Sequence, residues 1–239
     1  MDWKAQHVQF ALFASPSPQA PDALQAWTTL FGIPPETFQR PRGPVPVSQA
    51  TGQAGAFQIT VAAQPGRIDV FLADPSNQEG DGLLEDVDGA LAEAERLCRK
   101  ALEAQRVLRV ALVVPLVSDQ PSQGAANKAL HELLPFISIS PAARDVIFQI
   151  NEPRAFPRIS YQMNRLCTWS SAILQRFNLT LQGAGQVAVI DQRHVVSFQI
   201  DVNSATTEQL RPSQAKAILS ALVAEARQLK SAGYPRLVG

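Results

Sequence analysis

Residues 193–203, RHVVSFQIDVN, constrain the fold of this chain more than any other segment. Bulky apolar residues alternate there with small polar ones, and the two sets are Val196, Phe198, Ile200 and Val202, and Ser197, Gln199, Asp201 and Asn203. A period of two places each set on its own face of a strand, one buried and one polar. Strands of parallel sheets are apolar on both faces, so the segment predicts a half-buried strand of an antiparallel sheet.

The composition favours a folded protein with no overall electrostatic preference. Hydrophobic residues make up 46% of the 239, enough to fill the core of one large domain or two small ones. The 21 basic and 21 acidic residues cancel, so no net field draws the chain to nucleic acid or to an anionic membrane. With only two cysteines and no apolar run of roughly 18 residues, we expect a soluble cytoplasmic protein without a disulfide framework or a membrane partner.

The first half of the chain is predicted to have the order β-α-β-β-α-β. Asp22 and Gly32 are suited to cap a short helix, and Pro65-Gly66 to form a tight turn between two strands. The expected strands are 6–13, 57–63, 68–72 and 107–117, and the expected helices are 22–31 and 83–105. This is the order of a ferredoxin-like split βαβ unit, a fold analogy that implies no chemistry.

One long segment of the first half has no apolar periodicity. Residues 33–55 are rich in Pro, Gly, Gln and Ser, which predicts an exposed loop. Whether this loop is a binding element or a mobile connection is left open by the sequence.

The second half is predicted to be an antiparallel β-meander flanked by helices. The polar residues 118–124 suggest a linker, which divides the chain into units 1–118 and 119–239. Pro212 and Gly233 are suited to begin and end a final helix. The other expected elements are a helix at 125–134, strands at 146–150, 159–163, within 168–181, at 187–190 and at 193–203, and turns at 183–185 and 191–192. The predicted fold class is therefore α+β with two lobes.

Strand parity argues against the catalytic groups that the sequence offers. His194 and Asp201 have opposite parity, so they leave opposite faces of a regular strand and cannot form a triad with Ser170 or Ser171. Cys167 lies near arginines that could lower the pKa of its thiol, but its place in an alternating segment favours a small buried hydrophobe.

Metal and phosphate motifs are absent from the sequence. The three histidines lie far apart, and no glycine-rich phosphate loop occurs, so we expect no cofactor. Asp201, Glu152 and Asn203 could together bind a hard cation. Hydrogen bonds from such strand-end side chains to nearby turns are the favoured interpretation.

Residues 151–169 interleave arginines with aromatic residues. This composition occurs in ordinary surface and core packing, at protein interfaces and at sites that stack nucleic-acid bases. Ordinary packing is the favoured interpretation, and the neutral net charge disfavours the nucleic-acid site. The candidate binding residues are Arg154, Arg158, Tyr161, Arg165, Trp169, Asp201 and Asn203.

No motif in the sequence is specific enough to name a reaction. We therefore expect a non-enzymatic module for protein interaction or assembly, whose partner is another protein or a second copy of the chain. Two alternatives stay open at this point. One is a metal-dependent hydrolase or phosphodiesterase that uses Asp201 and Glu152, and the other is a single-stranded nucleic-acid binder that uses residues 154–169.

Overall fold

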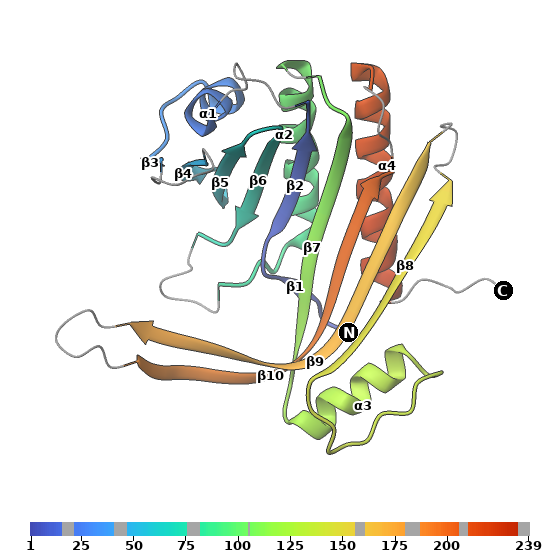
Figure 1. Ribbon diagram of the computed structural model, residues 1–239. Helices are drawn as coiled ribbons and strands as arrows, with labels where there is room; N and C mark the ends of the chain where they lie inside the picture. Colours follow the sequence, from blue (N-terminus) through green and yellow to red (C-terminus); the bar gives the residue numbers. More distant parts are fainter. Residues whose placement is uncertain are drawn as a thin grey trace.

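The computed structural model describes residues 1–15, 22–40, 47–75, 82–104, 106–155, 161–179, 187–205 and 210–233. These residues form an α+β fold with four helices and one ten-stranded antiparallel sheet (Figure 1). The helices are α1 (Ala23–Phe31), α2 (Val87–Ala104), α3 (Gln123–Leu133) and α4 (Pro212–Ala232). The strands are β1 (Lys4–Ala5), β2 (Val8–Phe13), β3 (Thr37–Gln39), β4 (Ser48–Ala54), β5 (Phe57–Gln64), β6 (Arg67–Ala73), β7 (Arg109–Gln120), β8 (Val146–Ala155), β9 (Gln162–Leu179) and β10 (Val187–Ser204).

The sheet runs without interruption through both halves of the chain. Its order is β3-β4-β5-β6-β2-β7-β10-β9-β8, and β1 adds to β7 beside this path. Strands β7 and β10 join the halves and pair from His194↔Gln120 to Asn203↔Ala111. The predicted linker at 118–124 therefore starts inside the sheet, because Ser118 to Gln120 are the last residues of β7.

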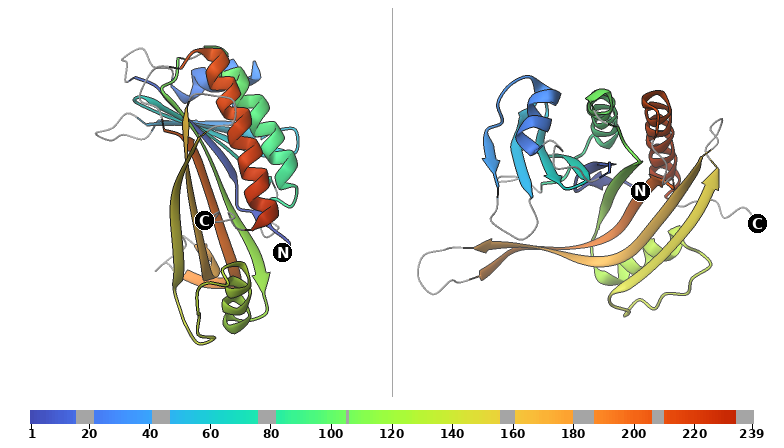
Figure 2. Two further views of the ribbon diagram at one scale, coloured as in Figure 1. Left: turned by 90° about the vertical axis from the view of Figure 1, so that its right-hand side faces the viewer. Right: turned by 45° about the horizontal axis from the view of Figure 1, so that its top comes forward.

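All four helices pack on the same face of the sheet. Helices α1, α2 and α4 lie side by side across it, and α3 covers its lower end (Figures 1 and 2). The apolar set of the segment 193–203 points to this face and is fully buried, as predicted, and Phe198 stacks on Trp169 with ring centroids 4.9 Å apart. On the opposite face no helix lies among the described residues.

Several local signals were interpreted correctly from the sequence. Asp22 caps α1 with its side chain, and Gly32 ends that helix with a φ of 72°. Gln64 pairs with Arg67 across the predicted turn, where Gly66 has a φ of 74°. Pro212 opens α4 and Gly233 ends it in the left-handed conformation that glycine tolerates best.

The prediction of a loop at 33–55 was wrong. Residues Thr37–Gln39 and Ser48–Ala54 form β3 and β4, and β4 pairs with β5 along its whole length. The alternation in β4 was missed because its buried residues are small, namely Ser48, Ala50 and Gly52. Their size is set by α1: a Cβ atom at Gly52 would lie 2.9 Å from Cζ2 of the buried Trp27.

The second half has fewer and longer strands than predicted. Strand β9 merges two predicted strands, and β10 merges the strands expected at 187–190 and 193–203. The turn predicted at 191–192 is instead a register shift between Val189 and Asp191 within β10. The turn predicted at 183–185 lies outside the described residues.

Candidate functional site

Two of the arginines predicted to bind a partner, Arg154 and Arg165, contact the same carboxylate of α4. Arg165 has a side chain that is only 3% exposed, and its guanidinium contacts Glu152 and, at 3.0 Å, Glu225 of α4. Arg154 lies 3.6 Å from the same Glu225 carboxylate. Burial opposes the charged form of Arg165, but the hydrogen bonds that its guanidinium donates to Glu152 and Glu225 raise the pKa of Arg165 overall. The network joins β8 and β9 to α4.

The two candidate aromatic residues of this segment, Tyr161 and Trp169, both pack against the core. Trp169 is fully buried and donates a hydrogen bond of 2.9 Å from Nε1 to the carbonyl oxygen of Gly233. Tyr161 is half-buried against the core. Arg158 lies outside the described residues. Arg165 and Trp169 therefore present no surface on which a base or a partner could stack. Of the two candidate arginines that the structure describes, Arg154 is exposed and Arg165 is buried.

The polar candidate residues Asp201 and Asn203 lie on the face of the sheet without helices. Asn203 donates to Oδ1 of Asp201 at 3.1 Å and accepts from Asn164 at 3.3 Å. Glu152 is directly opposite Arg165 and so points to the helix-covered face, whereas Asp201 is opposite Leu166. The structure therefore does not bring Glu152 and Asp201 together, and the cation site that the hydrolase alternative needs is not formed by them.

The cysteines are buried and free. Burial raises the pKa of Cys167 to about 12 despite the neighbouring Arg165, and it raises the pKa of Cys98 well above its usual value. Neither thiol is suited to act as a nucleophile. In the part of the chain that the structure describes, no group of three or more His, Cys, Asp or Glu side chains could hold a metal ion.

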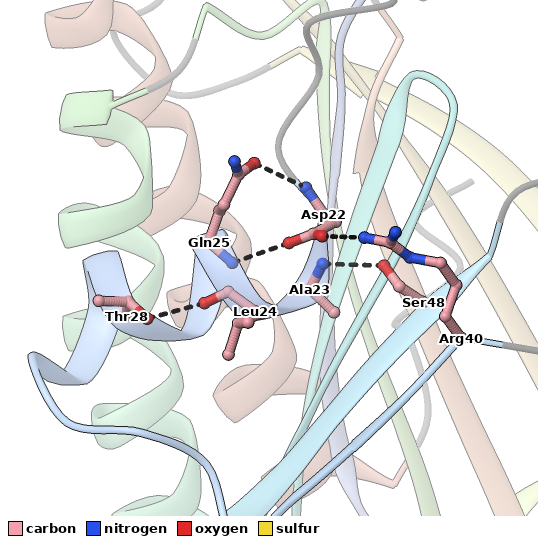
Figure 3. A network of polar contacts seen from close by, with 7 residues as sticks. All are labelled: Asp22, Ala23, Leu24, Gln25, Thr28, Arg40 and Ser48. Atoms are coloured by element: carbon pink, nitrogen blue, oxygen red, sulfur yellow. Dashed lines mark hydrogen bonds and ion pairs between the residues drawn. The ribbon is translucent and has the colours of Figure 1, made fainter.

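A polar network at the start of α1 has a structural role. Asp22 accepts a hydrogen bond from the backbone of Gln25 at 2.9 Å and contacts Arg40, which follows β3 (Figure 3). The backbone N–H of Ala23 donates to the buried hydroxyl of Ser48 at 2.9 Å. These contacts hold the helix against β4 and leave Asp22 no free role in chemistry.

The uncovered face carries a row of charged and aromatic side chains that the sequence did not reveal. Phe13 on β2 pairs with Arg67 on β6 and with Arg109 on β7. The two guanidinium carbons lie 4.9 and 5.0 Å from the centre of the Phe13 ring. Only the register of three strands brings these residues together, and no local sequence pattern encodes that register.

The outer part of the β9–β10 hairpin projects beyond the rest of the sheet (Figure 1). Pairing of β10 with β7 ends at His194, whereas pairing with β9 continues to Val187↔Leu179. This outer ribbon, residues 175–179 and 187–192, bends away from the sheet (Figures 1 and 2). Its base is anchored on the uncovered face, where Leu83 packs with Val117 and Val195.

Comparison with known protein families, with curated protein sequences and with solved structures finds no match to this chain. None of the helices in the described segments is long and apolar enough to cross a membrane.

Proposed function

We propose that the protein is a non-enzymatic interaction or assembly module and that the outer ribbon of the β9–β10 hairpin is its main contact element. The carrying observation is that, among the described residues, the outer parts of β9 and β10 pair only with each other, whereas the inner parts also pair with β8 and β7. An isolated two-stranded ribbon is marginally stable in water and has two open edges. A partner that adds a strand or covers one face would stabilise it.

The predicted binding residues support this proposal less than the ribbon does. Arg165 and Trp169 are committed to internal contacts, so a partner would not use them. The uncovered sheet face lies beside the base of the ribbon and supplies further exposed polar groups, such as Gln199. The partner in this proposal is another protein or a second copy of the chain.

We also infer a finer description of the fold. The order β5-β6-β2-β7, antiparallel throughout and covered by α1 and α2, supports a ferredoxin-like first unit within residues 1–118. The second unit, residues 119–239, would extend this sheet by β10, β9 and β8 with α3 and α4 as its covering helices.

The proposal is tested by shortening the ribbon in the full chain. Residues 176–191 are replaced by Asn-Gly, a pair suited to a two-residue hairpin turn between Gln175 and Gln192. All pairing between β7 and β10 is kept. We expect the native chain to co-purify with a partner or to elute as a defined oligomer, and the shortened chain to lose that association.

Arg96→Gln is a matched control, since Arg96 is exposed on α2 and forms a surface ion pair with Glu93. This variant should keep the association. A native chain that elutes as a monomer and captures no partner, or a shortened chain that associates as well as the native one, would contradict the proposal.

A further inference from the structure

Phe13 on the uncovered face lies between Arg67 and Arg109, which are both directly opposite it on the neighbouring strands. Arg67 has an ion-pair partner, whereas Arg109 has none among the described residues. Arg67 starts β6 and Arg109 starts β7, and β2 lies between these strands. Two residues further along, Asp69 and Ala111 are both opposite Ala11 of β2. The sequence pattern is therefore Arg-Ile-Asp on one side of β2 and Arg-Val-Ala on the other.

On the Arg67 side of this row the guanidinium has a counter-ion, the carboxylate of Asp69. Nη2 and Nε of Arg67 each lie 2.7 Å from one oxygen of the Asp69 carboxylate, although the Nε contact is an ion pair that is not aligned as a hydrogen bond. Gln9 donates a further hydrogen bond of 2.8 Å to Asp69. A guanidinium that rests on the Phe13 ring in this position thus already binds a carboxylate, by one hydrogen bond and one ion-pair contact.

The Arg109 side has the cation without the anion. Nε of Arg109 is buried and has no hydrogen-bond partner, and Arg109 makes no ion pair with any residue that the structure describes. Ala111 occupies the position that corresponds to Asp69. A partly desolvated guanidinium without a counter-ion is costly, so an anion that reaches it is bound favourably. The side chain as a whole is half-buried, so a ligand can reach the guanidinium from solvent.

We propose that Arg109 binds the carboxylate of a ligand. This carboxylate pairs with Arg109 in the same way as the carboxylate of Asp69 pairs with Arg67. The charge of the row favours a monoanion over a phosphate, because Arg67, Asp69 and Arg109 together leave one positive charge and Asp69 repels a second negative charge. Phe13 holds the guanidinium by a cation–π contact, which limits the conformational entropy lost when the ligand binds.

This site is independent of the outer ribbon and of the partner proposed for it. The carboxylate belongs either to a small organic acid or to an acidic side chain of a peptide. Both sources present the same group to Arg109, and the experiment distinguishes them by probe.

The test uses the full chain and follows the Nε–H resonance of Arg109 by NMR. Acetate, chloride and inorganic phosphate are titrated separately at constant ionic strength. We expect a saturable shift with acetate, no saturable shift with chloride, and weaker binding of phosphate than of acetate. No shift with acetate, or tighter binding of phosphate, overturns the proposal.

Two variants and a control complete the test, with thermal stabilisation by acetate as the common readout. Arg109→Gln should abolish the stabilisation, whereas Arg106→Gln, a change at an exposed arginine three positions away, should leave it intact. Ala111→Asp supplies an internal carboxylate and should remove the acetate response. If Ala111→Asp does not fold, the comparison of Arg109→Gln with Arg106→Gln decides alone, and equal responses in those two overturn the proposal.

The source of the carboxylate is resolved with a capped, extended peptide that contains a single glutamate. Binding at least tenfold tighter than acetate assigns the site to a peptide. Equal binding assigns it to a small organic acid.

Discussion

At the scale of single residues, burial decides chemical behaviour more than neighbours in the sequence do. Cys167 illustrates this, since Arg165 two positions away would by itself lower the pKa of the thiol. Burial outweighs this charge and raises the pKa to about 12, because the thiolate would lie in the core beneath α4. The alternation of Cys167 with Leu166 and Thr168 in the sequence predicted this buried environment correctly.

We predict that Cys167 resists alkylation in the folded protein. With a pKa of about 12, only about one thiol in ten thousand is ionised at pH 8, and the side chain is 1% exposed. Iodoacetamide at pH 8 should therefore leave Cys167 unmodified in the native chain and modify it fully in urea, as measured by peptide mass spectrometry. Rapid labelling of the folded chain would show that the site opens to solvent.

At the scale of elements, the assembly of the second half depends on contacts that the sequence does not mark. Helix α4 was predicted from its apolar stripe, but the ion network that joins it to β8 and β9 was not predicted, and Arg154 and Arg165 were candidate binding residues. Arg165 has the parity of Cys167 and Trp169, and this parity was the available signal that it points to the covered face. Its partner Glu225 lies 60 residues away in the sequence, so the pairing itself could not be predicted.

We predict that Arg165→Met lowers the free energy of unfolding by about 3–5 kcal/mol, because it leaves the Glu225 carboxylate without its closest cation in a largely buried position. Adding Glu225→Leu should recover most of this loss, since the second change removes the unpaired charge. Urea denaturation of both variants measures the effect. Arg96→Gln breaks an exposed pair with Glu93 and should cost less than about 1 kcal/mol. If Arg165→Met is as stable as the native chain, the ion network contributes little to stability.

At the scale of the whole molecule, the sequence predicted the fold class but not the sheet. An α+β fold rich in antiparallel strands follows from the alternation in segments such as 193–203. The strand order does not, because it depends on pairings between distant segments such as β7 with β10. The same limit applies to the site: Phe13, Arg67 and Arg109 come from three strands, and only their register places the two arginines on one ring.

The continuous sheet predicts that the two halves of the chain are coupled in stability. One buried cluster contains core residues of both halves, including Trp27 and Trp169, and α2 packs on α4. Gly52 lies on β4, far from the second half in the sheet order. Gly52→Ala should destabilise this part of the chain by about 1–3 kcal/mol, because the added Cβ would lie 2.9 Å from Trp27 and overpack the core. We expect the slowest-exchanging amides of β9 and β10 to exchange faster in this variant, by the same free energy as those of β5 and β6.

Hydrogen exchange followed by NMR on the full chain measures this coupling. Gly124→Ala in α3 is the control, since the nearest atom to its Cβ would be at 3.8 Å, an ordinary contact, and no amide should exchange faster. Faster exchange in Gly52→Ala that stops at residue 118 would show instead that units 1–118 and 119–239 unfold separately, in spite of the pairing between β7 and β10. Coupled exchange would mean that a ligand bound at Arg109 on β7 also stabilises the strands that carry the outer ribbon, because β7 belongs to the same cooperative unit.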